Sequence, residues 1–130
     1  MNLRRFALAV LALPMAAFFG FVGWHKSVDS LADLARYHAW TVWLHEWLGR
    51  LVGLSELLCA VALLVALHPR GRRIAGLSGA VLIVNQLAAA AVHLAHGESA
   101  ALPQNAVLIA LLGLIVWIVR PASRPEGVGE

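Results

Sequence analysis

The chain has 130 residues, of which 61% are hydrophobic and only 13% are charged. Soluble domains are nearer half apolar and a quarter charged, so the composition indicates an integral membrane protein with one compact domain. The net charge of +3 does not indicate nucleic-acid binding, because the ten Lys and Arg residues lie mostly at the ends of apolar runs. The single cysteine, Cys59, excludes an internal disulfide and a CxxC redox motif.

Four segments are long and apolar enough to cross ~30 Å of hydrocarbon, which takes ~20 residues of helix. We expect the spans at residues 6–24, 48–67, 74–96 and 102–119. The predicted fold is therefore all-α, an integral membrane four-helix bundle that occupies residues 1–119. The first segment has the basic start of a signal peptide, but no A-x-A cleavage site follows it, so we expect a span there.

The distribution of basic residues predicts the orientation. With four spans, seven arginines fall on one side of the membrane: Arg4, Arg5, Arg70, Arg72, Arg73, Arg120 and Arg124. The positive-inside rule then places both termini in the cytoplasm, and we expect the bacterial cytoplasmic (inner) membrane. The tail, residues 120–130, is rich in Pro and Gly and is predicted to be disordered in the cytoplasm.

The connection between the first two spans, residues 25–47, is the one sizeable segment outside the membrane. Apolar residues recur there at helical spacing from Val28, which predicts a short amphipathic helix with Ser27 or Asp29 as its N-cap. A cluster of tryptophans follows: Trp40, Trp43 and Trp47. Because such aromatic residues settle at the level of the lipid headgroups, the loop is either a lid on the bundle or only an interfacial anchor.

Glu56 is the residue that an apolar span is least expected to contain. It lies eight residues past Leu48, or ~12 Å into the membrane at 1.5 Å per residue. Gly49 and Gly53 share its helix face, and such small residues let a second helix approach closely. Because an ionisable residue inside a span costs about 3 kcal/mol to insert, we predict that Glu56 faces the bundle interior and has a function. A structural hydrogen bond between helices is the alternative.

Further polar residues occur at matching depths in the other spans. Asn85 and Gln86 lie ~15 Å inside His96, at a depth similar to that of Glu56. His93 lies nearer the outer surface, where the first span ends and the fourth begins. We predict that one polar cavity in the outer half gathers the candidate ligand-binding residues: Glu56, Gln86, Asn85, His93, Arg50, Lys26 and Asn105.

Metal and haem binding are weaker hypotheses. Most of the histidines fall on the outer side, and His93 with His96 forms an i, i+3 pair on one helix. A zinc site needs three or four protein ligands, and a haem needs an axial ligand, often from facing helices. No histidine spacing here is diagnostic of either. The sequence therefore predicts no metal site, with His93 and His96 as the only weak candidates.

Short motifs, taken in chain order, carry a family resemblance. Arginines precede the first span, which ends in the G-x-x-K pattern of Gly23 and Lys26. The second span holds its acid in the G-x-x-E-L context of Gly53 and Glu56. "LIVNQLAAAAVHLAHGE" and "LPQNAVLIALLGLIVW" then supply a late histidine and an early asparagine. Together these motifs resemble the DoxX family over about residues 4–119, and the resemblance implies a four-helix membrane protein.

The resemblance implies no single activity. The family takes its name from a subunit linked to thiosulfate:quinone oxidoreduction, many members are described as redox-associated membrane proteins, and distant relatives resemble chaperones or cargo receptors. We expect a non-catalytic membrane subunit or binding protein that holds a quinone- or lipid-like ligand, or a partner's segment, in the outer cavity.

Two alternatives stay open. One is a membrane component of a quinone-linked redox system, an oxidoreductase subunit in which His93 relays protons to a bound quinone. The other is an assembly factor or chaperone for membrane proteins, acting through small-residue helix faces, through which the chain could also form a homodimer. Three spans have such faces: Ala16/Gly20, Gly49/Gly53 and Gly76/Ala80.

Overall fold

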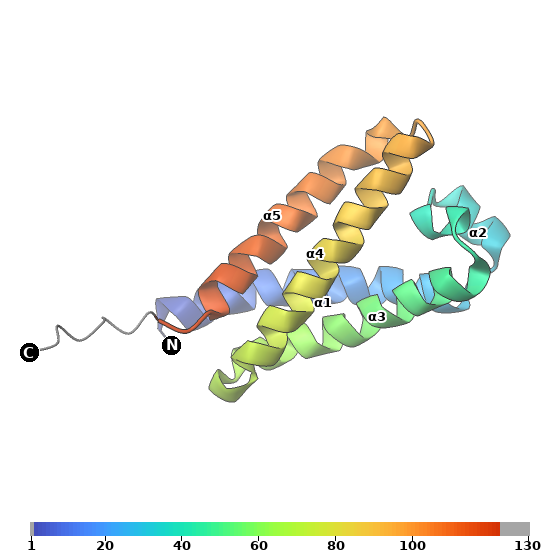
Figure 1. Cartoon of the computed structure of the whole chain (residues 1–130). Helices are drawn as coiled ribbons and strands as arrows, with labels where there is room; N and C mark the ends of the chain where they lie inside the picture. Colours follow the sequence, from blue (N-terminus) through green and yellow to red (C-terminus); the bar gives the residue numbers. More distant parts are fainter. Residues whose placement is uncertain (1, 123–130) are drawn as a thin grey trace, which may run out of the picture.

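The computed structural model describes residues 2–122, and within that range the chain is helical without any β-strand (Figure 1). The helices are α1 (Leu3–Val28), α2 (Leu31–Arg36), α3 (Glu46–Leu64), α4 (Arg72–Ala95) and α5 (Leu102–Val119). All but α2 are long and apolar enough to span a membrane. The predicted four-helix membrane fold is therefore confirmed. Most of the tail predicted to be disordered, residues 120–130, lies outside the described residues.

Four short 3-10 turns join the helices: η1 (Trp40–Trp43), η2 (Val65–Leu67), η3 (Pro69–Gly71) and η4 (Ser99–Ala101). The prediction that Ser27 or Asp29 caps the loop helix is wrong, because α1 continues to Val28 and Asp29 ends it. Ser30 caps α2 instead, and its Oγ accepts a hydrogen bond from the backbone N–H three residues further on. The longer α1 brings Lys26 inside the helix.

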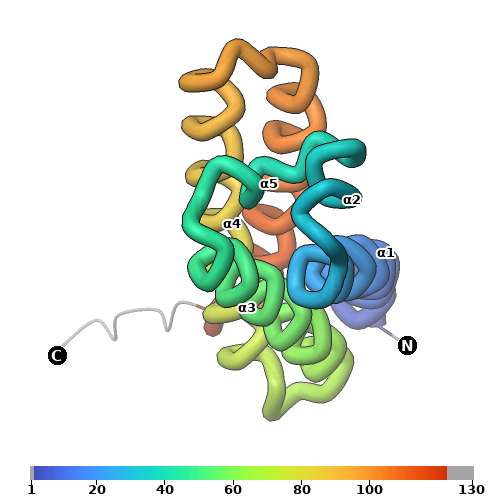
Figure 2. Tube along the Cα trace, turned by 90° about the vertical axis from the view of Figure 1, so that its right-hand side faces the viewer, coloured from blue at the N-terminus to red at the C-terminus, as the bar shows by residue number. Residues whose placement is uncertain are grey.

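The long helices form two pairs that diverge at one end of the molecule. α1 packs along α3, and α4 packs along α5, with α3 and α4 joining the pairs. Figure 1 shows α5 close to the start of α1 and farther from it where α2 lies. We call this the α2 end. In Figure 2 the segment of α2 and η1 lies between the two pairs there, and η1 contacts both α3 and α4.

The apolar core fills the half of the bundle away from the α2 end. Its fully buried side chains come from all four long helices: Leu8, Phe19, Leu63, Ala75, Leu82, Leu112 and Ile115. Large apolar side chains also cover the outside, among them Leu13, Leu58, Leu77, Val107 and Trp117. A soluble monomer rarely exposes so much continuous apolar surface, so this surface suits the acyl chains of a lipid bilayer.

Candidate functional site

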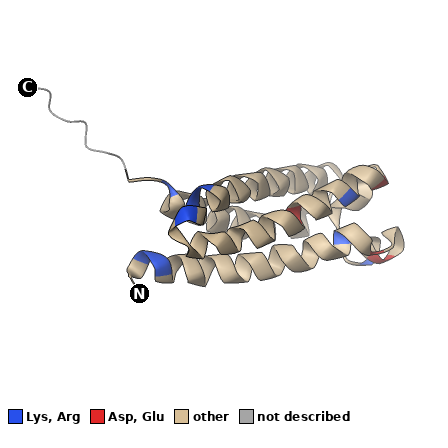
Figure 3. Cartoon of the chain, turned by 90° about the horizontal axis from the view of Figure 1, so that it is seen from below, with Lys and Arg blue, Asp and Glu red and all other residues tan. Residues whose placement is uncertain are grey.

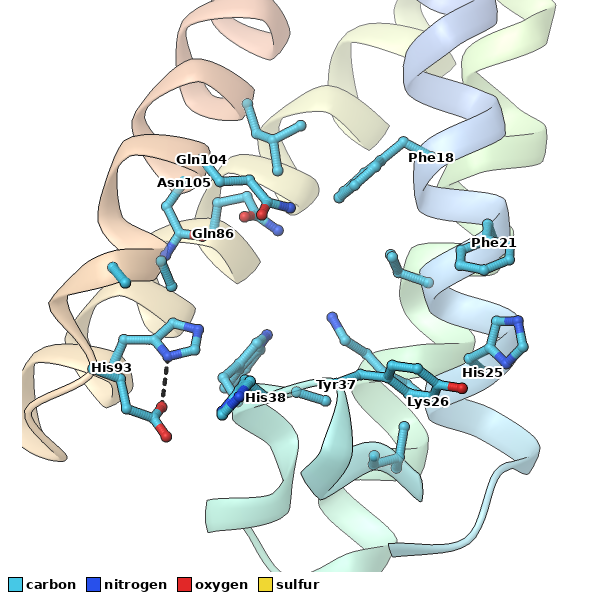
Figure 4. A pocket seen from close by; sticks show the side chains of 18 residues that line it. Phe18, Phe21, His25, Lys26, Tyr37, His38, Gln86, His93, Gln104 and Asn105 are labelled. Atoms are coloured by element: carbon cyan, nitrogen blue, oxygen red, sulfur yellow. Dashed lines mark hydrogen bonds and ion pairs between the residues drawn. The ribbon is translucent and has the colours of Figure 1, made fainter. Parts of the chain in front are cut away.

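A cavity of about 660 Å³ lies at the α2 end, between α1, the segment of α2 and η1, and the facing ends of α4 and α5 (Figure 4). This volume is within the range of ~300–1,000 Å³ that small-molecule sites occupy. Its apolar lining comes mainly from α1 and α5: Phe18, Phe21, Val22 and Leu108. Its polar lining includes four of the residues predicted from the sequence: Lys26, Gln86, His93 and Asn105.

Lys26 forms a buried ion pair with Glu56 behind the cavity wall. The Nζ of Lys26 donates to both carboxylate oxygens of Glu56, at 2.9 and 2.8 Å. Glu56 is fully buried, as the sequence predicts for a residue that faces the interior. Its partner, however, is a lysine of α1 and not an amide of α4. Glu56 therefore lies behind Lys26, which is the member of the pair that reaches the cavity.

Two glycines allow the helices to cross closely enough for this pair to form. A Cβ atom added at Gly53 would lie 2.7 Å from the Cβ of Lys26 and 2.9 Å from the backbone N of Ser27. A Cβ at Gly23 would lie 2.7 Å from the carbonyl oxygen of Gly53. Because these contacts are to backbone or to Cβ atoms, no larger residue fits without separating α1 from α3. The G-x-x-K and G-x-x-E motifs thus build one contact.

Two buried hydrogen-bond donors on the cavity wall have no partner. They are the Nδ2 of Asn105 on α5 and the Nε1 of Trp40 on η1, and each side chain is only 6% exposed. The ring of Trp40 also lies over the Nζ of Lys26, with 5.6 Å between the nitrogen and the ring centroid. Buried polar groups in folded proteins are nearly always hydrogen-bonded. Both nitrogens have almost no accessible surface, so they lie within the wall and do not open into the cavity.

His93 is held at the cavity by a carboxylate from the turn after α4. Its Nδ1 lies 2.8 Å from an Oε2 of Glu98, and its other ring nitrogen lies on the cavity side in Figure 4. The hydrogen bond from His93 lowers the pKa of Glu98 below its usual range, and a hydrogen bond from Trp43 contributes to the shift. With Nδ1 donating to Glu98, the second nitrogen is an acceptor that can take a proton from a ligand.

Besides Glu56, two of the predicted site residues, Asn85 and Arg50, lie outside the cavity lining. The Nδ2 of Asn85 donates to the Oγ of Ser55 at 3.0 Å and so joins α4 to α3. Arg50 donates to the backbone oxygen of Lys26 at 2.9 Å and to the carboxylate of Glu46 at 3.1 Å. Both residues hold helices together around the site. The orientation of Asn85 depends on how α4 packs on α3, and that of Arg50 on how α3 packs on α1, which single-helix periodicity does not give.

The weak metal candidates do not form a cluster. The ring of His96 stacks on Trp43 with centroids 3.9 Å apart, while His93 is turned to Glu98. Within residues 2–122, no group of three or more His, Cys, Asp or Glu side chains is arranged to hold a metal ion. The polar side chains that line the cavity can instead form hydrogen bonds and exchange protons with a bound molecule.

The sequence places Trp40 only in the tryptophan cluster of the possible lid, and it names neither Trp40 nor Glu98 among the binding residues. Trp40 falls in the tryptophan cluster that indicates a membrane interface, but it is buried, whereas Trp43 and Trp47 are at least half exposed. A 3-10 turn has no long periodic pattern that separates its inner face from its outer one. Glu98 lies in a short turn, and its sequence position does not indicate that it folds back on His93.

In a comparison with protein-family models, residues 10–115 match the model described as the DoxX-like family. The matched range contains the cavity and both motifs of the crossing between α1 and α3. No curated protein and no solved structure matches the chain.

Proposed function

This chain belongs to the DoxX-like family of membrane proteins, and from that premise we propose that it is a non-catalytic membrane subunit or binding protein for an amphipathic molecule. The molecule would be quinone- or lipid-like and would occupy the cavity at the α2 end. One observation carries the proposal: a cavity of ligand size has an apolar side with Phe18 and Phe21 and, across from it, a polar side with Gln86 and His93.

The two walls suit the two parts of such a ligand. A polar head would lie beside Gln86, His93 and Lys26, which line the cavity. An apolar chain would lie along Phe18 of α1 and toward α5. Phe18 and Phe21 of α1 and Leu108 of α5 line this part of the cavity, so the apolar part of the ligand would lie between these two helices.

A second candidate is a component of a quinone-linked redox system. The pairing of His93 with Glu98 supports it, because a histidine oriented by a carboxylate can pass a proton to a reduced quinone oxygen. With a single cysteine and no dithiol in the sequence, the electrons would come from a partner protein. A quinone that is reduced in the presence of such a partner, and a loss of this reduction in His93→Phe, would separate this candidate from simple binding.

The packing gives less support to an assembly factor that acts through small-residue faces. Gly49 approaches Thr41, Gly53 approaches Lys26, and Gly76 approaches Val119. Because these faces are used within the chain, they are not free to bind another protein's helix. The proposal therefore takes a small amphipathic ligand as the occupant.

We also propose a bacterial cytoplasmic membrane, with both termini in the cytoplasm. Figure 3 shows that basic residues gather at the end away from α2, where the chain begins. The described residues there include Arg4, Arg5, Arg70, Arg72, Arg73 and Arg120. Under the positive-inside rule this end is cytoplasmic, so the cavity would open in the outer leaflet.

A cavity-filling variant tests the proposal. Val22→Trp places a large ring on the cavity wall, whereas Val10→Trp changes the same residue type at an exposed position of α1 outside the cavity lining. Each protein would be purified with its native lipid, and the bound small molecules would be quantified by mass spectrometry. We expect Val22→Trp to lose its amphipathic ligand by about tenfold, or ~1.4 kcal/mol. Equal amounts in Val22→Trp, Val10→Trp and the wild type would contradict the proposal.

A further inference from the structure

A second hollow lies at the end of the bundle away from α2, between the start of α1 and the end of α5. It is an open groove of about 590 Å³, and none of its residues belongs to the lining of the cavity at the α2 end. Its lining is apolar, with Leu3, Ala7 and Trp117 among the residues, except for Arg4 and Arg120. In this separate groove, two arginines thus border an apolar surface.

Arg4 is fixed at the groove without losing its charge. Its Nε and Nη2 donate to the backbone oxygen of Ile118 at 3.0 and 2.7 Å, and Nη2 also donates to the backbone oxygen of Arg120 at 3.0 Å. These partners are carbonyl groups, so no carboxylate neutralises the guanidinium. The remaining nitrogen, Nη1, donates to no described group and is not buried, so it is accessible to an anion.

Arg120 brings a second guanidinium to the same groove. Its Cζ lies 5.3 Å from the centroid of the Trp117 ring, and both residues are exposed. Tryptophan and arginine side chains at the ends of membrane helices settle at the level of the lipid headgroups. The end of α5 carries a partial negative charge of about half a unit, which offsets only part of the charge of the two arginines.

No described carboxylate balances these arginines. The described Asp and Glu residues all lie farther toward the α2 end: Asp29, Asp33, Glu46, Glu56 and Glu98 (Figure 3). Further arginines gather at the same end as the groove: Arg5, Arg70, Arg72 and Arg73. The groove therefore lies in a positive potential that attracts an anionic group.

The apolar part of the groove indicates that the anion is carried by a lipid. Leu3 is 83% exposed and Trp117 is 57% exposed, on helices whose outer faces suit acyl chains. Basic pockets between membrane helices bind anionic headgroups, and a guanidinium forms paired, charge-assisted hydrogen bonds with a phosphate. A zwitterionic lipid fits less well, because it would bring its own ammonium group close to the arginines.

We infer that this groove binds an anionic phospholipid, with the head phosphate beside Arg4 and Arg120 and an acyl chain along Trp117. The site is distinct from the cavity at the α2 end and does not depend on the function proposed for it. It takes a lipid of the surrounding bilayer and is selective for the charge of the head.

The position of Trp117 allows a direct test. The other four tryptophans lie at the α2 end: Trp24, Trp40, Trp43 and Trp47. The full-length protein would be placed in nanodiscs of dioleoylphosphatidylcholine that contain a small fraction of brominated phosphatidylglycerol or brominated phosphatidylcholine with the same acyl chains. Bromine quenches tryptophan fluorescence on contact, and the difference between wild type and Trp117→Phe gives the quenching of Trp117.

We expect brominated phosphatidylglycerol to quench Trp117 at about a tenfold lower mole fraction than brominated phosphatidylcholine. Each arginine near a membrane surface contributes about fivefold to the binding of an anionic lipid, and the end of α5 offsets part of the total. Equal quenching by the two lipids would overturn the inference.

Variants assign the preference to the groove. Arg120→Gln should reduce it about fivefold, and this variant should keep the fold because the contact between Arg120 and Arg4 uses a backbone oxygen. Arg4→Gln should reduce it as well, although it also removes the hydrogen bonds to Ile118. Arg70→Gln makes the same change of charge at an exposed residue outside the groove and should leave the preference unchanged. Equal losses in Arg120→Gln and Arg70→Gln would show a diffuse attraction to the whole basic end and would overturn the site.

Discussion

The helix α1 meets its two neighbours in opposite ways. Toward α3 it forms a close seam, in which Gly23 and Gly53 bring the backbones together and Lys26 pairs with Glu56. Toward α5 its contact is near its start, where Arg4 donates to the backbone oxygen of Ile118 at 3.0 and 2.7 Å. Farther along, the two helices leave room for the cavity. The close contact between α1 and α3 thus stabilises the fold, and the separation of α1 from α5 leaves space for the cavity.

Lys26 takes part in both regions. Glu56 of α3 neutralises the charge of Lys26, and the side chain of Lys26 also lines the cavity between α1 and α5. A change in the close seam should therefore lower stability, whereas a change on the open side should alter binding. The variants below test that division.

The largest effect is expected when one member of the buried ion pair is removed. Lys26→Met or Glu56→Leu leaves the other charge buried without a partner and should cost about 3–5 kcal/mol of unfolding free energy. The double variant should recover much of this loss, because two apolar side chains can pack in place of the pair. Unfolding in mixed micelles would measure the cycle. Additive losses in the double variant would contradict a direct pair.

A smaller loss is expected from Gly53→Ala. The new methyl would lie 2.7 Å from the Cβ of Lys26, so α1 and α3 must separate, at a cost of about 1–3 kcal/mol. Gly113→Ala is the control, because a Cβ there has nothing within 4 Å, and alanine favours a helix over glycine by up to ~1 kcal/mol. The same micelle assay applies. A Gly53→Ala protein as stable as Gly113→Ala would show that the seam is not close-packed.

The sequence predicts the four long helices and the inward direction of Glu56 because both depend on features local to one helix. Length and hydropathy give the spans, and helical spacing aligns Glu56 with Gly49 and Gly53. The partner of Glu56 depends instead on how α1 crosses α3. The sequence predicts Lys26 in the same cavity as Glu56, but Lys26 lies past the predicted end of the first span, at residue 24, so its direct pairing with Glu56 does not follow from the sequence.

The site is less predictable than the fold for the same reason. Gln86, His93 and Asn105 line the cavity, but their near neighbour Asn85 is turned to Ser55. Adjacent residues on a helix point about 100° apart, so the choice between Asn85 and Gln86 depends on the rotation of α4 against its neighbours. Trp40 comes from a turn whose position depends on contacts with α3 and α4.

The smallest effect is expected at the edge of the open side, from the pH response of Glu98. Its hydrogen bond from His93 lowers its pKa below the ordinary 4.5. A lowered pKa means that the folded state favours the carboxylate, so this contact stabilises fully above pH 4.5 and is lost as the pH falls through the lower native value.

The wild type should therefore be more stable than Glu98→Gln at neutral pH, and this difference should shrink as the pH falls through that acidic window. Thermal unfolding followed from neutral to acidic pH would measure both proteins, in which all other carboxylates titrate alike. Parallel curves would show that the contact between His93 and Glu98 does not contribute.

The central claim is that an amphipathic ligand binds in the cavity on the open side, and the indole N–H signal of Trp40, a residue of the cavity lining, tests it most directly. The protein contains five tryptophans, and Trp40→Phe would assign this signal in a ¹⁵N–¹H spectrum of the protein in nanodiscs. On titration with methyl oleate, we predict a saturable shift of the Trp40 signal, with the exposed Trp24 and Trp47 unchanged. A Trp40 signal that stays fixed while those of the exposed tryptophans move would contradict the account.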